Sequence, residues 1–221
     1  MLLNADLQWL KKKWETLNVN IAPEIADKWF PFIVSQYTQM HRFYHNLGHV
    51  QSLLQYAEKY SQQLKNIPAL KWAIWFHDSI YDPQSKENEF NSNQVWLQFV
   101  QEAKNIDELT NKMVQAMILG SASHTLNTIP KELLTENDED VLSFFDFDLS
   151  ILSSEKSVYE EYAQSIRKEY AHVPEKLYKE GRIKVLEVFL SREIYYSQTF
   201  KALEPQAKEN MQKELMKLKN I

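Results

Sequence analysis

Residues 69–78 read ALKWAIWFHD, and this stretch decides the fold. It is apolar nearly all the way round a helical wheel, as expected of a helix buried in the middle of a bundle. Pro68 suits the first turn of such a helix, because the backbone N–H that proline lacks is not needed there. His77 and Asp78 end the apolar run. We therefore expect a central helix that carries a polar pair at its buried end.

The rest of the chain also predicts helices. Only 3 glycines occur in 221 residues, and no Asn-Gly or Asp-Gly pair of the kind that closes a β-hairpin is present. Asn46 can cap a helix in which apolar residues from Leu47 to Leu64 recur with the 3.6-residue period. The other predicted helices span residues 3–17, 23–40, 69–78, 86–102, 107–119, 137–152, 155–171, 181–195 and 205–218. We therefore expect an all-α protein, a single compact multi-helix domain over residues 1–221.

The composition excludes several classes of protein. A hydrophobic content of 44% with 25% charged residues is typical of a folded chain and not of a disordered one. Because there is no cysteine, a disulfide framework, a thiolate metal cluster and a cysteine nucleophile are excluded. A net charge of −5 gives no global positive field for extended nucleic acid or an anionic membrane. The sequence shows neither a secretory signal nor a membrane span, so we expect a cytoplasmic protein.

Two short strings carry the candidate chemistry. Residues 44–49 read YHNLGH, and residues 77–82 read HDSIYD. His49 borders the apolar face of its predicted helix, where it can project into a crevice. An ionised Asp78 at a buried helix end needs a cation, and imidazole with carboxylate suits Zn, Mn, Fe, Co, Ni or Mg. The structural alternative is that Asp78 caps or pairs with a neighbour while His77 bonds a carbonyl, and spacing alone leaves both open.

Three parts of the sequence together resemble a known family. His49, then the His77-Asp78 pair, then an aspartate in the string FDFDL resembles the H…HD…D pattern of the HD-domain superfamily of metal-dependent phosphohydrolases. The strings RFYHNLGHV, WFHDSIYDP followed by ENEFNS, FDFDLSIL, and IRKEYAHVP followed by GRIKVLEVFLSREIYY are similar, in that order, to an uncharacterised group of predicted HD phosphohydrolases. The likeness covers a motif-bearing core of about residues 25–200.

The resemblance implies an HD-domain-like helical bundle in which one divalent cation is held by His49, His77, Asp78 and a later aspartate. It favours Asp148 as the last ligand, because the family-like string has the ligand just before a leucine. Asp146 is the runner-up. The two aspartates lie about 200° apart on a helix, so both cannot face one metal while the backbone stays helical.

A second resemblance makes His45 the candidate general acid. The string His45-Asn46-x-x-His49 is also similar to the metal-binding signature of cyclic-nucleotide phosphodiesterases, in which the first histidine gives a proton to the leaving oxygen. An imidazole that titrates near neutral pH, one turn from a metal ligand, can protonate an alkoxide leaving group. The alternative is that His45 caps or packs. The run NEF at residues 88–90 resembles the same enzymes only faintly.

Four further residues are candidates beside these motifs. Asp82 is a candidate catalytic residue and Glu87 a candidate substrate contact, since both can face the metal side of the loop after Asp78; the alternative is that they are solvated turn residues. Arg42 is a candidate substrate-binding residue, because a guanidinium binds phosphoryl oxygens in a bidentate manner. His124 lies in a polar loop, where it can contact substrate or simply be exposed.

Together these residues predict a metal-dependent phosphohydrolase that acts on a small phosphomonoester, phosphodiester or nucleotide-type substrate through a metal-activated water. The resemblance also implies a single principal metal site, since two-metal members of the superfamily look to require further histidines between the HD pair and the last aspartate. His124 is the only histidine between Asp78 and Asp146. The alternative is a non-catalytic metal- or nucleotide-binding regulatory module with the same helical fold. The amphipathic end helices can pair with a second copy, which gives a homodimer, or close the bundle.

Overall fold

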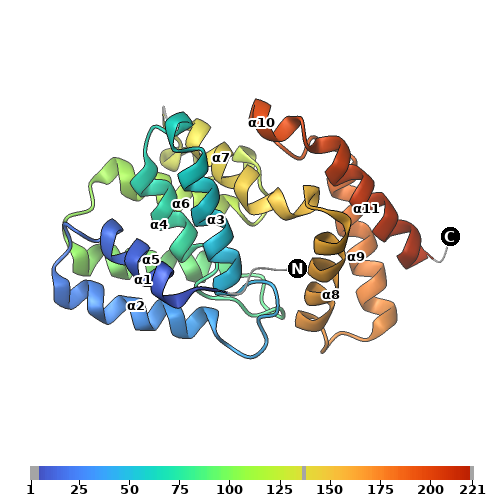
Figure 1. The fold of residues 1–221 in the computed structure, drawn as a ribbon, viewed down its shortest axis with the longest axis horizontal. Coiled ribbons are helices and arrows are strands. Elements are labelled where there is room, and N and C mark those ends of the chain that lie inside the picture. The colour runs from blue at the N-terminus through green and yellow to red at the C-terminus, as the bar shows by residue number, and fades with distance from the viewer. Residues whose placement is uncertain (1–4, 136–137, 220–221) are drawn as a thin grey trace. The chain divides into compact units, whose positions relative to one another are not determined.

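The computed structural model describes residues 5–135 and 138–219, and every regular element within them is a helix (Figure 1). The prediction of an all-α protein is therefore confirmed. The described chain forms two compact units, which we call the N-terminal unit (residues 5–135 and 138–145) and the C-terminal unit (residues 146–219). Each unit is described by itself, and a single domain over the whole chain stays a prediction. Among the described residues, no helix combines the length and the apolar character needed to cross a lipid bilayer.

The N-terminal unit is built on the helix that the apolar run predicts. Its elements are α1 (Leu7–Leu17), α2 (Pro23–Tyr37), α3 (Leu47–Lys59), η1 (Ser61–Gln63), α4 (Ile67–Phe76), α5 (Asn88–Ala103), α6 (Glu108–Gly120), η2 (Leu126–Thr128), η3 (Lys131–Leu133) and most of α7 (Asp138–Asp148). Helix α4 packs against α3, α5 and α6. From Ala69 to Phe76 every residue of α4 except Lys71 is buried, which confirms the predicted central helix.

Aromatic packing and capping explain why α4 takes this position. The rings of Trp72 and Phe76 lie with their centroids 4.8 and 5.2 Å from that of Phe99 in α5. Pairs of this kind add to the stabilisation that burial alone provides. At the other end of the helix, the Asn66 side chain caps α4, and the buried Asp140 carboxylate of α7 accepts the Asn66 N–H at 2.6 Å. These bonds fix the N-terminal end of α4. The helix ends at Phe76, directly before His77 and Asp78.

One carboxylate of the C-terminal unit bonds to two other helices. Its elements are η4 (Leu149–Ser153), α8 (Lys156–Glu169), α9 (Glu175–Leu190), α10 (Gln198–Lys201) and α11 (Glu204–Lys219). Arg182 of α9 donates to Glu214 of α11 through Nε at 2.8 Å and Nη2 at 3.0 Å. Tyr159 of α8 donates its O–H to the same carboxylate at 2.5 Å. Glu214 therefore links three helices.

Two helices at the ends of the N-terminal unit differ from their predicted bounds. Helix α1 begins at Leu7, where the Asp6 side chain accepts two backbone N–H groups, and not at residue 3. Residues 3 and 4 of the predicted helix lie outside the described residues. The predicted helix over residues 137–152 is α7 from Asp138, followed from Leu149 by the tighter η4. Its residue 137 also lies outside the described residues.

Helix α9 begins earlier than the sequence analysis predicts. It starts at Glu175, directly after Pro174, so that Gly181 is an interior residue and not the first one. The physical reason is that proline is well suited to the start of a helix, while a single glycine inside a helix costs only about 1 kcal/mol. Pro174 therefore marks the start of α9.

Candidate metal centre

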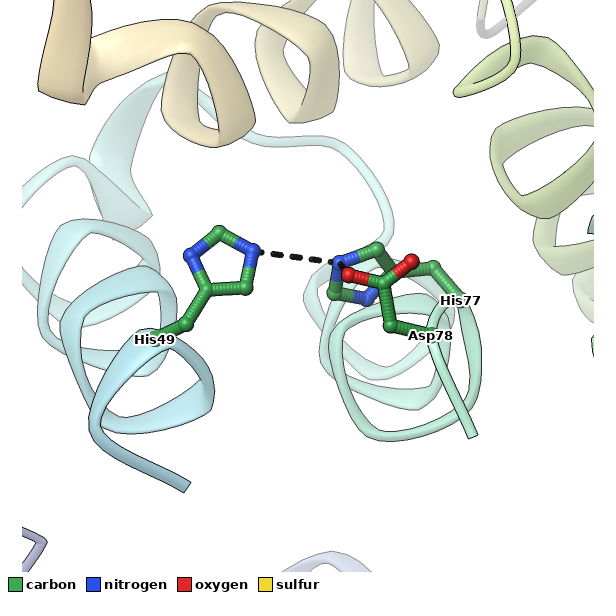
Figure 2. Close-up of side chains that lie close together, drawn as sticks. All are labelled: His49, His77 and Asp78. Carbon is green, nitrogen blue, oxygen red and sulfur yellow. Dashed lines mark hydrogen bonds and ion pairs between the residues drawn. The ribbon is translucent and has the colours of Figure 1, made fainter. Parts of the chain in front are cut away.

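Three side chains of the N-terminal unit converge on one point. His49 lies in the first turn of α3, and His77 and Asp78 follow directly after α4. The Nε2 atom of His77 is 3.2 Å from Nε2 of His49 and 3.2 Å from Oδ2 of Asp78. Figure 2 shows the two imidazoles facing each other, with the Asp78 carboxylate beside the His77 ring. Each of the three offers a ligand atom within 4.8 Å of the other two, so they form a group that can hold a metal ion.

A backbone hydrogen bond fixes the proton on His77. Its Nδ1 lies 3.0 Å from the carbonyl oxygen of Ile74. A carbonyl only accepts, so Nδ1 carries the proton and Nε2 of the neutral ring presents a lone pair. Metal-binding histidines are typically oriented by such a bond from the other ring nitrogen. The lone pair of His77 therefore points at the place where His49 and the Asp78 carboxylate also meet.

The distances in this group are compatible with a bound divalent cation. His77 is 1% exposed, and a neutral Nε2 lone pair 3.2 Å from a carboxylate oxygen is unfavourable without a positive charge between them. Nitrogen ligands bound about 2.0–2.1 Å from one metal lie about 2.8–3.4 Å apart at right or tetrahedral angles. The observed separations of 3.2 Å lie in that range. The three donors therefore fit a divalent cation.

Local capping places each of the three ligands. Asn46 begins α3, and its side chain accepts the Gly48 N–H at 2.8 Å, as the sequence predicts. This cap sets the turn in which His49 lies. At α4, the His77 N–H still completes the helix by donating to the Ala73 carbonyl at 2.8 Å. The C-terminal end of a helix carries a partial negative charge, which adds to the attraction for a cation at this point.

His45 lies beside this group. The centroid of its ring is 6.1 Å from that of His49 and 4.4 Å from that of Tyr81, and its residue is partly exposed. The residue predicted as a general acid is thus near a candidate ligand and within reach of solvent. Its role as the proton donor stays a prediction.

Arg42 makes contacts that differ from those of a phosphate clamp. It is 6% exposed, and its Nη1 donates to the carbonyl oxygens of His45 at 3.1 Å and Asp78 at 2.7 Å. Its Nη2 donates to the carbonyl oxygen of Ser79 at 3.2 Å. These bonds join the two segments that carry the candidate chemistry. The geometry therefore favours a structural task for this guanidinium over direct binding of substrate.

Asp82 and Glu87 lie in the exposed turn that precedes α5. The Asp82 side chain accepts the Gln84 N–H at 2.9 Å, and its backbone forms two hydrogen bonds with the Asn88 side chain. Glu87 donates its backbone N–H to Ser85 Oγ at 3.0 Å. The group formed by the three ligands includes neither carboxylate. These contacts favour the interpretation that Asp82 and Glu87 are solvated turn residues over a role for them at the metal site.

Glu89 is a neighbour of the site that the sequence analysis did not select. Burial raises the pKa of its carboxyl, and the negative charge of Asp78 raises it further, whereas His124 and His77 act in the opposite direction. Glu89 therefore lies in the electric field of the candidate ligands, together with His124. Its only signal in the sequence is the NEF run at residues 88–90.

The backbone of His124 is held in an uncommon conformation. Its φ of 53° lies in the left-handed region, which glycine or asparagine usually adopts where a helix ends. The His124 N–H donates to the Gly120 carbonyl at 2.8 Å, and its ring lies 5.8 Å from that of Phe145. A Cβ on Gly120 would come within 2.4 Å of Phe145, so this helix end requires glycine. The predicted contact of His124 with substrate stays a prediction.

The two aspartates of the FDFDL string belong to the C-terminal unit, so they are described apart from the three grouped ligands. Asp146 is buried, and its two carboxylate oxygens accept the N–H groups of Tyr196 and Ser197 at 2.8 Å each. Burial nonetheless raises the pKa of Asp146. This carboxylate has a structural task within its unit. The assignment of Asp148 as the fourth ligand stays a prediction.

The raised pKa of Glu89 predicts a pH-dependent stability. Between the ordinary value of 4.5 and the higher pKa in the folded protein, the folded state binds more protons than the unfolded state, so stability falls as pH rises. Glu89→Gln cannot ionise and is expected to be more stable than the wild type at neutral pH but not at about pH 4. Urea unfolding of both proteins in a chelator, from about pH 4 to 8, measures the difference. A difference that does not change with pH would contradict this prediction.

Comparison of the chain with known proteins gives no match. No family model matches the chain, and neither the curated proteins nor the solved structures compared with it give a match. The site therefore has to be judged on its own geometry.

Proposed function

We propose that this protein is a metal-dependent phosphohydrolase that acts on a small phosphomonoester, phosphodiester or nucleotide-type substrate. One observation carries the proposal: Nε2 of His77 lies 3.2 Å both from Nε2 of His49 and from Oδ2 of Asp78, and the other ring nitrogen of His77 is bonded to the Ile74 carbonyl. All three donors are nitrogen or oxygen, which suits Mn, Fe, Zn, Co, Ni or Mg. We also propose a cytoplasmic location, where small phosphorylated compounds are available.

In this proposal His49, His77 and Asp78 would hold the cation. A divalent cation bound there would lower the pKa of a water molecule and neutralise charge on phosphoryl oxygens. The His45 imidazole, beside His49, would give its proton to the leaving oxygen. His77 would keep its proton on Nδ1, held by the Ile74 carbonyl, so that its Nε2 stays available as a ligand.

The proposal is tested by metal analysis of the purified protein together with a hydrolysis assay. We expect about one divalent ion per chain. We also expect turnover of p-nitrophenyl phosphate, bis-p-nitrophenyl phosphate or a nucleoside monophosphate in the presence of Mn²⁺. Bound metal without turnover of any phosphate ester would instead favour a non-catalytic metal-binding module. Absence of bound metal after reconstitution would contradict both.

Replacement of His45 separates proton donation from metal binding. His45→Ala is expected to keep its metal content and to lose about 10²–10⁴-fold in kcat, because a positioned general acid contributes a factor of that order. The alkaline limb of the kcat–pH profile should be lost with it, since that limb reports the acid that must be protonated. His172→Ala is the control, because His172 is an exposed histidine in the C-terminal unit. Unchanged kcat in His45→Ala would remove His45 from the reaction.

A further inference from the structure

We infer that Arg42 is a positioning residue, whose guanidinium fixes the proton donor segment at His45 relative to the ligand segment at Asp78. This inference rests on the proposed function, in which His45 gives a proton and Asp78 binds the cation. It replaces the phosphate contact that the sequence suggests for this arginine. It concerns the backbone of both segments, because Arg42 donates to a carbonyl group in each of them.

The first step of the argument is the sharing of one nitrogen. The Nη1 atom of Arg42 donates both to the His45 carbonyl at 3.1 Å and to the Asp78 carbonyl at 2.7 Å. The two carbonyls come from segments 33 residues apart, residue 45 in the loop before α3 and residue 78 after α4. A second bond, from Nη2 to the Ser79 carbonyl at 3.2 Å, fixes the rotation of the guanidinium plane. One rigid group therefore sets the separation of the two segments.

The second step is the support on either side of the guanidinium. Its central carbon lies 5.0 Å from the ring centroid of Tyr37 and 5.4 Å from that of Tyr81. The hydroxyl of Tyr37 accepts the Asp78 N–H at 3.2 Å. The N–H and the C=O of Asp78 are thus held by two side chains that also contact each other. The Tyr81 ring, in turn, lies 4.4 Å from the His45 ring, so it contacts both the guanidinium and the proton donor.

The third step compares arginine with lysine at position 42. An arginine that attracts phosphate by its charge can be replaced in part by lysine, which is also a cation. A guanidinium that binds three carbonyls in a fixed plane cannot, because an ammonium group lacks that fork of donors. Arg42 is also 6% exposed, which leaves it little surface for a ligand. The comparison of Arg42→Lys with a neutral variant therefore separates the two roles.

The experiment measures Mn²⁺ affinity by calorimetry, together with kcat and KM for bis-p-nitrophenyl phosphate, in wild type, Arg42→Lys and Arg42→Met. We expect both variants to bind Mn²⁺ about 10–100-fold more weakly, as when a group that orients a ligand is lost. Turnover at saturating Mn²⁺ should fall about 10²-fold with little change in KM, which is the effect of a small misplacement of reacting groups. Lysine should rescue neither quantity. A rise in KM that lysine largely restores would overturn the inference in favour of a phosphate contact.

Arg167→Lys is the matched control. Arg167 also donates to two backbone carbonyls, those of Tyr170 at 2.7 Å and Val173 at 3.2 Å, and lies over the ring of Tyr178 at 4.5 Å. It belongs to the C-terminal unit and joins no candidate ligand, so its replacement should leave Mn²⁺ affinity and kcat unchanged. Equal losses in the Arg167 and Arg42 variants would show a general loss of folded structure and overturn the inference.

A milder variant keeps the inference testable if the Arg42 variants do not fold. Tyr37→Phe removes only the hydroxyl that accepts the Asp78 N–H and keeps the ring beside the guanidinium. We expect weaker Mn²⁺ binding in this variant as well, and unchanged affinity would overturn the inference. If the wild type binds Mn²⁺ but hydrolyses no ester, the proposed function fails, while the affinity measurements still decide whether Arg42 and Tyr37 position Asp78.

Discussion

His77→Ala is expected to lose bound metal and hydrolytic activity together. The Nε2 atom of His77 is the one that lies 3.2 Å from each of the other two ligand atoms, so its removal leaves His49 and Asp78 without their common neighbour. Loss of a residue that merely orients a ligand costs about 10–100-fold in metal affinity, and loss of the ligand itself should cost more. Turnover should fall to the rate of the uncatalysed reaction, because no cation remains to activate water.

Elemental analysis and the ester assay, carried out on the same preparation, test this prediction. Asp78→Asn is the companion variant, since it keeps the size of the side chain and removes the charge that the cation needs. Circular dichroism is needed to show that both variants remain helical, because His77 is buried and also bonds to Ile74. His172→Ala should behave as the wild type does. A folded His77→Ala protein that retains its metal and its turnover would refute the assignment of the metal site.

The parts of the fold that follow from local sequence are those that the sequence predicts well. The apolar run of α4 leaves no polar face, so burial is the only favourable place for it. The helix start at Asn46 follows from a side-chain hydrogen bond within two residues. The start of α9 at Glu175 is local too, but Pro174 signals both an end and a beginning, and the choice between them depends on packing.

The candidate site is only partly readable from the sequence, for a physical reason. A buried histidine and aspartate at the end of an apolar helix must find partners, so the pair His77 and Asp78 stands out. The tasks of Arg42 and Glu89 depend on which segments lie together in space. A guanidinium has the same chemistry whether it meets phosphate or a carbonyl, and only the fold decides that Arg42 meets carbonyls. The effect of the Asp78 charge on the pKa of Glu89 likewise depends on how the segments pack.

Replacement of Glu214 is expected to give the largest loss of stability in the C-terminal unit. The side chains of Glu214 and Arg182 are 11% and 9% exposed, and two hydrogen bonds join them. Glu214→Ala leaves the Arg182 cation in a site with little water. It also removes the acceptor of the Tyr159 hydroxyl, whose pKa is raised by burial and, next, by this carboxylate, so that it remains a proton donor. Breaking a buried pair in this way costs about 3–5 kcal/mol.

Urea unfolding of the whole protein measures this loss, and Glu209→Ala is the matched control on the same helix. Glu209 forms an ion pair with Lys213 one turn away, but its side chain is 54% exposed. An exposed pair of this spacing contributes only about 0.3–0.5 kcal/mol, so the control should differ little from the wild type. A loss in Glu214→Ala as small as that of the control would mean that Arg182 finds water or another partner.

A double variant tells whether the cost comes from an uncompensated charge or from the lost hydrogen bonds of the carboxylate. Arg182→Met with Glu214→Leu removes both charges and keeps most of the side-chain volume. If the stranded cation causes the loss in Glu214→Ala, the double variant should recover most of the stability, because apolar residues of similar volume often replace a buried pair at no net cost. If instead the loss of the hydrogen bonds that the Glu214 carboxylate accepts dominates, the double variant should be as unstable as the single one, because leucine leaves the Tyr159 hydroxyl without this acceptor. The first outcome is expected, since the guanidinium carbon of Arg182 lies 5.5 Å from the Tyr162 ring centroid and the Glu214 carboxylate stabilises its positive charge.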